Sequence, residues 1–290
     1  MSPTVKPSDA SLGAIVTDVD LASLDAEAWL EVEDAFLEHA VLVFPGQNLT
    51  TDAQTAFAMR FGDIEHLTGD PNMMAVPIAN VKADGSVMGE EEEFTQILRG
   101  NEGWHTDSSY MPLSAKASVL SAHVVTREGG QTEWADMRAA YDALDRETRE
   151  RAGTLSAYHS LYHSQAKIGH DAQAGTLFGF HTKGAPLRPL VKMHPRTGRN
   201  ALYIGRHAYG IPGLESEESE RLLDDLLAFA CSEPRVFRHT WQVGDVAVWD
   251  NRCVLHRARP YDYSLPRVMV HARVAGDPET ELAPTSIDHR

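Results

Sequence analysis

The chain has 290 residues, and its 42 acidic against 26 basic residues give a formal net charge of −16. This balance disfavours nucleic acid or an anionic membrane as the main partner. No apolar run approaches the roughly 18 residues that a transmembrane helix needs, and the amino terminus MSPTVKPSDA lacks the basic and apolar regions of a signal peptide.

The composition predicts a single domain spanning residues 1–290, in which 1–10 and 276–290 are flexible tails. There is no internal repeat and no low-complexity linker to divide the chain, and all-β domains of this size often form one core. The two cysteines, Cys231 and Cys253, are too few for a disulfide framework. Free thiols in a reducing compartment are the simpler interpretation, so we expect a cytoplasmic protein.

The first elements in chain order are a strand or hairpin arm at 12–21 and a helix at 25–40, followed by the short strand VLVFPG. The helix is predicted from apolar residues at helical spacing, which are Trp29, Val32, Phe36 and Leu37. A second helix is expected from Thr51 to about Phe61. Its Thr-Asp-Ala-Gln start fits a capping box, with Thr51 reaching the third amide and Gln54 reaching back.

Short β-type runs dominate the rest of the chain, namely SVLSAHVV, LRPLVKMH, NALYIG, DVAVWD and RVMVHARVA. One further helix is predicted in SEESERLLDDLLAFACSEP, where leucines form a stripe and Pro234 marks the end. Many short strands with few helices predict a mainly β fold, a sandwich or barrel with flanking helices. Two segments, 64–101 and 163–186, have no clear period and are expected to be lids or binding loops.

The stretch NEGWHTDSSYMP (101–112) contains the only His-x-Asp of a chain with 14 histidines. Alternation in a strand would point His105 and Asp107 to the same face, where both could bind one ion. An imidazole with a carboxylate suits Fe(II) or Mn(II) better than a closed structural zinc site. By itself the pair is a weak signal, and a surface histidine beside a turn aspartate remains the alternative.

A third ligand is available in the segment 243–273, where His256 follows the strand DVAVW. Two histidines and one carboxylate leave three coordination positions open, as an oxygen-activating iron centre requires. A 2-oxo acid can take two of them, and its far carboxylate then needs a bidentate cation. Arg267, eleven residues beyond His256, is the candidate, and Thr132 in GGQT can supply a hydroxyl.

Together, WHTD, GGQT, WDNRCVLH and the arginine eleven residues beyond His256 resemble the taurine dioxygenase family of Fe(II)- and 2-oxoglutarate-dependent oxygenases. The resemblance extends from about residue 12 to residue 275. It implies a double-stranded β-helix (jelly-roll) core, with O2 and 2-oxoglutarate as co-substrates. It also implies iron ligands at His105, Asp107 and His256, and 2-oxoglutarate contacts at Thr132 and Arg267.

Within the family, three stretches are most similar to aryloxyalkanoate dioxygenases of the (S)-phenoxypropionate type: WADMRAAYDALD, APLRPLVKMHPRTGR and IGRHAYGIPG. One position departs from the taurine enzymes, which carry a sulfonate-binding arginine four residues beyond the 2-oxoglutarate arginine. That position is His271 here. Taurine is therefore not the expected substrate.

A small carboxylic acid with an apolar, aromatic body is the expected substrate, and homo-oligomerisation is compatible with the sequence. Candidates to hold its carboxylate are Lys82, Arg206, His207 and His271, and candidates to line the apolar part are Met111, Leu161, Phe180 and Met269. For Cys253, and for the loop histidines His159, His163, His170 and His181, ordinary core or surface roles are the better interpretation.

The expected reaction is hydroxylation beside the ether oxygen of an aryloxyalkanoate, which releases a phenol, a 2-oxo acid, succinate and CO2. Three alternatives stay open. They are a hydroxylase of N-substituted amino acids, a non-catalytic metal-binding jelly roll that senses a small acid, and a zinc hydrolase. A clamp for a dicarboxylate at Arg267 and Thr132 disfavours the last two, because neither needs 2-oxoglutarate.

Overall fold

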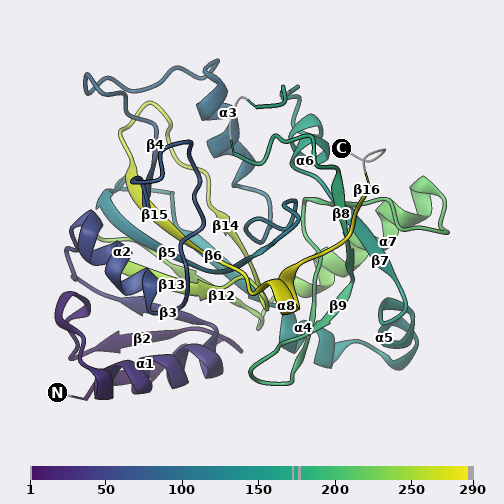
Figure 1. The fold of residues 1–290 in the computed structure, drawn as a ribbon, viewed down its shortest axis with the longest axis horizontal. Coiled ribbons are helices and arrows are strands. Elements are labelled where there is room, and N and C mark those ends of the chain that lie inside the picture. The colour runs from purple at the N-terminus through teal and green to yellow at the C-terminus, as the bar shows by residue number, and fades with distance from the viewer. Residues whose placement is uncertain (1, 172, 176–177, 287–290) are drawn as a thin grey trace.

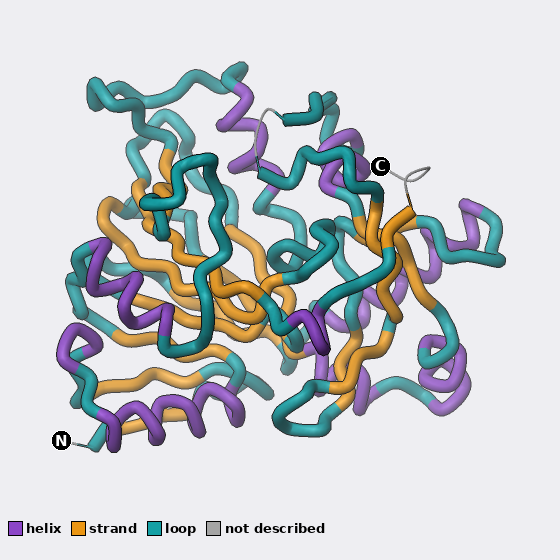
Figure 2. The backbone as a smooth tube through the Cα atoms, viewed as in Figure 1, coloured by secondary structure: helices purple, strands orange, loops and turns teal. Residues whose placement is uncertain are grey.

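The structure is a computed structural model that describes residues 2–171, 173–175 and 178–286. Its helices are η1 Leu21–Ser23, α1 Ala26–His39, α2 Thr51–Met59, α3 Glu93–Gly100, α4 Met137–Ala143, α5 Arg146–Ala152, α6 Leu161–Ala166, α7 Ser216–Ala230 and α8 Pro278–Glu281. Figure 2 shows them around strands that fill the middle of the molecule. Within the described residues, no helix combines the length and apolar character needed to span a membrane.

The strands form four sheets, the largest ordered β1-β2-β3-β13-β5-β15-β4 and the others β12-β6-β14, β11-β7-β8-β16 and β10-β9 (Figure 1). Their bounds are β1 Thr4–Pro7, β2 Ala14–Thr17, β3 Val41–Phe44, β4 Val76–Ala79, β5 Ala115–Val124, β6 Thr132–Asp136, β7 Ser156–His159, β8 Ala185–Pro189, β9 Val191–Met193, β10 Asn200–Leu202, β11 Ala208–Tyr209, β12 Val236–His239, β13 Val246–Asp250, β14 Val254–Ala258, β15 Val268–Ala275 and β16 Thr285–Ser286. The prediction of a mainly β fold with flanking helices is confirmed.

Alternation along the central strands divides the core into two layers. In β13, Val246 and Val248 pack against the helices α1 and α2, whereas Ala247 and Trp249 face the smaller β12-β6-β14 sheet. Trp249 meets Trp134 of β6 with ring centroids 5.9 Å apart. Because both faces are buried, these strands read as continuous apolar runs in the sequence.

The predicted helix begins at Thr51 as expected, but its capping residue was wrong by one position. Thr50, outside the helix, is the N-cap and its side chain accepts from the amide of Ala53. Thr51 is already helical and cannot cap. The Gln54 side chain does not reach back, because it is fully buried and donates to the carbonyls of Val119 and Val270.

The segment 64–101 is less irregular than its sequence indicated, since it contains β4 and α3. β4 is stabilised by its pairing with β15, in which Ala79 lies opposite Val268. No local sequence pattern predicts this long-range contact. The predicted strand around His105 is also replaced. His105 forms an isolated bridge with His256, and Asp107 lies in the following turn. These two pairings bring the site residues together.

Candidate active site

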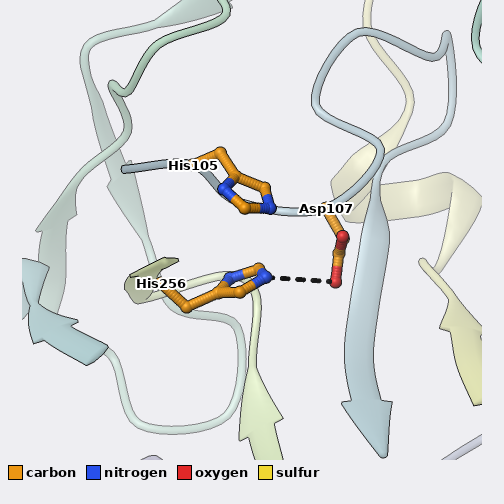
Figure 3. Close-up of side chains that lie close together, drawn as sticks. All are labelled: His105, Asp107 and His256. Carbon is orange, nitrogen blue, oxygen red and sulfur yellow. Dashed lines mark ion pairs between the residues drawn. The ribbon is translucent and has the colours of Figure 1, made fainter. Parts of the chain in front are cut away.

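The donor side chains of His105, Asp107 and His256 meet between the large sheet and the smaller β12-β6-β14 sheet. The backbones of His105 and His256 exchange hydrogen bonds of 3.0 and 2.7 Å, which sets their imidazoles side by side (Figure 3). Asp107 faces both, with its Oδ2 atom 3.8 Å from Nε2 of His256. One ligand atom from each of the three lies within 4.8 Å of the others, and all three residues are buried.

Neighbouring groups hold these side chains in the orientation that a metal needs. Nδ1 of His105 lies 2.8 Å from the carbonyl of Gly103. Since a carbonyl only accepts, Nδ1 carries the proton and the Nε2 lone pair is free. The carboxylate of Asp107 accepts from Ser118 Oγ at 2.6 Å through Oδ2 and from Arg273 Nη2 at 2.8 Å through Oδ1.

The charges of the site also suit cation binding. Burial lowers the pKa of His105 to about 4, against the raising influence of Asp107, so the ring is neutral near pH 7. Burial by itself would raise the pKa of Asp107, but Arg273 and the neighbouring imidazoles outweigh it and hold the pKa below its usual value. Burial likewise holds the pKa of His256 well below its usual value. Two neutral imidazoles and one carboxylate are a donor set that fits Fe(II). Their role as ligands stays a prediction.

A small cavity of about 100 Å³ opens on one side of the three donors. Thr132 and Arg267 lie in its wall. Arg267 is 6% exposed and donates to the carbonyl of Gly130 at 3.1 Å, and it has no acidic partner among the described residues. The Thr132 hydroxyl accepts from Trp241 Nε1 at 2.9 Å, which leaves its proton free to donate. A buried cation beside a hydroxyl donor suits a carboxylate.

A larger cavity of about 430 Å³ opens on the other side of the donors, with His105, Asp107 and Arg273 in its wall. Most of its remaining surface is apolar. That part comes mainly from the segment 67–97 and from three residues further along the chain, which are Leu161, Phe178 and Phe180. Such a lining with few polar groups is typical of a site for a small organic molecule.

Two of the four residues predicted to hold a substrate carboxylate line this larger cavity, namely Arg206 and His207. Arg206 donates to the carbonyls of Gly100 and Ser164 and has no acidic partner in the described parts of the chain. Burial lowers its pKa to about 10. The pKa of His207 is also lowered by burial, well below its usual value, so this ring is neutral.

The other two candidates lie elsewhere. Lys82 lines neither cavity and pairs at 2.9 Å with Glu92, where both side chains are about two-fifths exposed. His271 lies in the wall of the small cavity, with Nε2 3.7 Å from Oδ2 of Asp107 and its ring stacked on Trp249. His271 therefore faces the proposed metal and co-substrate, away from most of the apolar wall.

Among the apolar candidates, Leu161 and Phe180 line the larger cavity, and Met111 packs partly against them. The expectation for Met269 was wrong, because its side chain is fully buried in the core between the sheets. The four loop histidines line neither of these two cavities. The sequence analysis missed Arg273 as a partner of Asp107, although its place two residues beyond His271 on β15 was a usable signal.

A second group of potential ligand atoms is formed by His194, Asp250 and Cys253, all buried. Here the carboxylate is already neutralised, since it pairs at 2.6 Å with Arg252 and at 2.9 Å with His194. Burial raises the pKa of the Cys253 thiol, which keeps it protonated. This cluster is a buried ion-pair network, and the description of Cys253 as a small buried residue fits it.

Comparison with known proteins adds an independent observation. The model of the taurine catabolism dioxygenase TauD, TfdA family matches residues 4–273. The chain is 53% identical over 291 residues to a (S)-phenoxypropionate/alpha-ketoglutarate-dioxygenase of Sphingobium herbicidovorans, covering 98% of this chain and 99% of that protein. It is 38% identical over 291 residues to an alpha-ketoglutarate-dependent 2,4-dichlorophenoxyacetate dioxygenase of Cupriavidus pinatubonensis, covering 96% of this chain and 99% of the other.

Among solved structures, the chain is similar to the crystal structure of AAD-2 in complex with Mn(II) and N-oxalylglycine. The TM-score is 0.88 at 36% sequence identity, over 99% of this chain and 100% of the other. A taurine dioxygenase from Burkholderia xenovorans is also similar, with a TM-score of 0.79 at 26% identity, over 99% of this chain and 96% of that one. These likenesses confirm the predicted jelly-roll core.

Proposed function

The chain belongs to the taurine catabolism dioxygenase TauD, TfdA family, and from this premise we propose that His105, Asp107 and His256 are its iron ligands. It is an Fe(II)- and 2-oxoglutarate-dependent dioxygenase. The neutral imidazoles and the oriented carboxylate support the assignment of the three ligands. When bound, Fe(II) with 2-oxoglutarate and O2 supplies the hydroxylation of a C–H bond, with release of succinate and CO2.

We propose that Arg267 and Thr132 bind the far carboxylate of 2-oxoglutarate. The small cavity joins both residues to the three donors, so a short dicarboxylate can reach from one to the other. Arg267 is a buried cation without an acidic partner among the described residues. A buried charge in this state is costly unless a ligand compensates it. A planar guanidinium also matches a carboxylate bidentately.

For the substrate, we propose an aryloxyalkanoate whose carboxylate pairs with Arg206. The observation that carries this proposal is Arg206, a mostly buried cation that has no acidic partner among the described residues and lies in the wall of the mostly apolar larger cavity. The aromatic body would pack against side chains such as Phe178 and Phe180. Hydroxylation of the carbon that bears the aryl ether oxygen gives a hemiketal, which collapses to a phenol and a 2-oxo acid. The names of the similar proteins support this class.

The imidazole of His271 argues against taurine as the substrate. Burial lowers the pKa of this ring to about 4, so it is uncharged at neutral pH and offers a sulfonate no positive charge. An N-acyl amino acid remains the alternative substrate, because it also carries a carboxylate beside a heteroatom. Its amide group would need hydrogen-bond partners, and the mostly apolar wall of the larger cavity supplies few.

A substrate panel tests the proposal. The protein is supplied with Fe(II), 2-oxoglutarate and air, together with (S)-2-phenoxypropanoate, its (R) enantiomer, an N-acyl amino acid or taurine. We expect a phenoxypropanoate to accelerate succinate formation most and to release phenol in equal amount. A stable hydroxylated N-acyl amino acid would favour the alternative, and fastest turnover of taurine would refute the substrate proposal. Absence of succinate with every compound would refute the enzyme assignment.

We also propose that the protein acts in the cytoplasm as one domain, on a small carboxylic acid and without nucleic acid or membrane as a partner. The formal charge of −16 supports this view, because a strongly acidic surface repels both polyanions.

A further inference from the structure

Asn80 lies directly after β4, at the edge of the large sheet, and its side chain is fully buried. The carboxamide faces the segment that leads into β15. Its nitrogen donates to the carbonyls of Tyr263 at 2.9 Å and Leu265 at 2.8 Å, and its oxygen accepts from the amide of Arg267 at 2.8 Å. The backbone amide of Asn80 donates to the carbonyl of Arg267 at 3.3 Å.

These contacts replace the sheet pairing that Arg267 lacks. β15 begins at Val268, whose partner in β4 is Ala79, so Arg267 lies just before the first paired residue. The segment before Arg267 is a turn closed by the hydrogen bond from the amide of Leu265 to the carbonyl of Asp262. Without the Asn80 side chain, the backbone bond from the amide of Asn80 to the carbonyl of Arg267 would be the main contact left between this segment and β4. The side chain of Asn80 therefore fixes the backbone from which the Arg267 guanidinium enters the small cavity.

The chemistry of the contact requires an amide. Two carbonyl oxygens and one N–H face the side chain, and only a carboxamide offers two donors on one atom and an acceptor on the other. An aspartate would place an oxygen against two carbonyl oxygens, and an alanine would leave the buried amide of Arg267 and the partly buried carbonyls of Tyr263 and Leu265 without this partner. Either change displaces the segment, because unsatisfied buried polar groups cost about 1–3 kcal/mol each.

We propose that Asn80 is a positioning residue for 2-oxoglutarate, acting through Arg267. The inference rests on the proposed role of Arg267 but assigns a new function to a residue that touches neither cavity. In enzymes, a displacement of a positioning group by about 1 Å can lower the reaction rate on the order of 100-fold. Loss of the Asn80 amide should therefore weaken co-substrate binding much more than metal binding, since the metal donors lie on other segments.

Gln54 provides a matched control. It is also fully buried, and its side chain likewise donates to two carbonyls, of Val119 and Val270, and accepts a third hydrogen bond, from Ser121. It holds the same strand, β15, but lines neither of the two cavities. A substitution of Gln54 thus removes equivalent contacts without reaching Arg267.

The test measures binding of N-oxalylglycine to the Mn(II)-loaded protein by calorimetry, and Mn(II) binding by itself. N-oxalylglycine is a dicarboxylate in which an N–H replaces the methylene beside the keto group of 2-oxoglutarate. In Asn80→Asp and Asn80→Ala, we expect its affinity to fall by about 10- to 100-fold, with Mn(II) affinity nearly unchanged. Gln54→Ala should lower the melting temperature to a similar extent yet keep both affinities.

Wild-type affinity for N-oxalylglycine in a folded Asn80→Asp protein would overturn the inference. An equal loss in Gln54→Ala would also overturn it, because the effect would then be a general loosening of β15. Arg267→Ala, measured in parallel, separates this failure from failure of the proposed co-substrate site. If Arg267→Ala keeps full affinity, the site assignment falls and the inference with it. Asn80→Ser, which retains one donor, serves the same comparison if the aspartate variant does not fold.

Discussion

Replacing Arg206 by alanine should separate substrate binding from co-substrate binding. Burial lowers the pKa of this arginine well below its usual value, to about 10, and each pKa unit corresponds to about 1.4 kcal/mol. The buried guanidinium thus carries an electrostatic penalty on the order of 3 kcal/mol, which a substrate carboxylate beside it would offset. Since about 1.4 kcal/mol changes an equilibrium constant tenfold, the Michaelis constant for the acid should rise roughly 100-fold.

The assay is steady-state release of succinate with either compound varied. In Arg206→Ala, the Michaelis constant for 2-oxoglutarate should stay close to the wild-type value, because Arg267 lies in the wall of the other cavity. Arg206→Gln is the companion variant, since it loses the charge but can still donate to the carbonyl of Gly100 or Ser164. A wild-type Michaelis constant for the acid in a folded variant would refute the assignment.

Arg267→Ala should raise the Michaelis constant for 2-oxoglutarate by well over about tenfold, because a lost charge-assisted contact costs about 2–5 kcal/mol. Thr132→Ala should raise it less, and an unchanged constant in the arginine variant would move the co-substrate site elsewhere. Alanine at any of the three proposed iron ligands should abolish turnover and weaken Mn(II) binding while circular dichroism stays native. Asp107→Ala is the variant best able to retain activity, since another anion can enter an open position, and full activity in the others would refute the ligand set. His159 is buried, and neither of its ring nitrogens has a hydrogen-bond partner among the described residues. Burial holds its pKa well below 6.5. As the pH falls through 6.5, the unfolded state takes up this proton first, so stability is lost by up to about 1.4 kcal/mol per pH unit. His159→Phe should lose less stability between pH 7.5 and 5.5 in urea unfolding, and an equal loss in both proteins would contradict this account.

The sequence was most informative where its signal was local. Short β-type runs predicted the central strands, and the motifs around His105, Asp107 and His256 predicted residues that the structure brings together. Arg267 and Thr132 were predicted from their spacing and share the wall of the small cavity. In each of these motifs, the chemistry restricts which residues can occur at a given spacing.

The sequence was least informative about contacts between distant segments. Asn80 accepts a hydrogen bond from Arg267, which is 187 residues away in the sequence, and nothing in ANVKADG predicts that contact. Gln54 was assigned to a local cap although its partners lie 65 and 216 residues away. Lys82, in turn, resembled a binding residue because it lies in a glycine-containing turn, but it pairs with Glu92 at the surface. The role of such residues depends on their burial and on their tertiary contacts, and a short stretch of sequence predicts neither.

The two walls of the larger cavity have different origins. The donor His105 is fixed by its backbone bridge to His256, whereas most of the apolar surface comes from the segment 67–97 and from Leu161, Phe178 and Phe180. Changes in the cavity-lining side chains of these outer segments, with Asn80 and the pairing of β4 retained, therefore alter which molecule fits without disturbing the chemistry. A single scaffold can therefore diversify along this division, and exchange of the lining side chains in 67–97, with Asn80 kept, is the way to redirect the enzyme to other carboxylic acids.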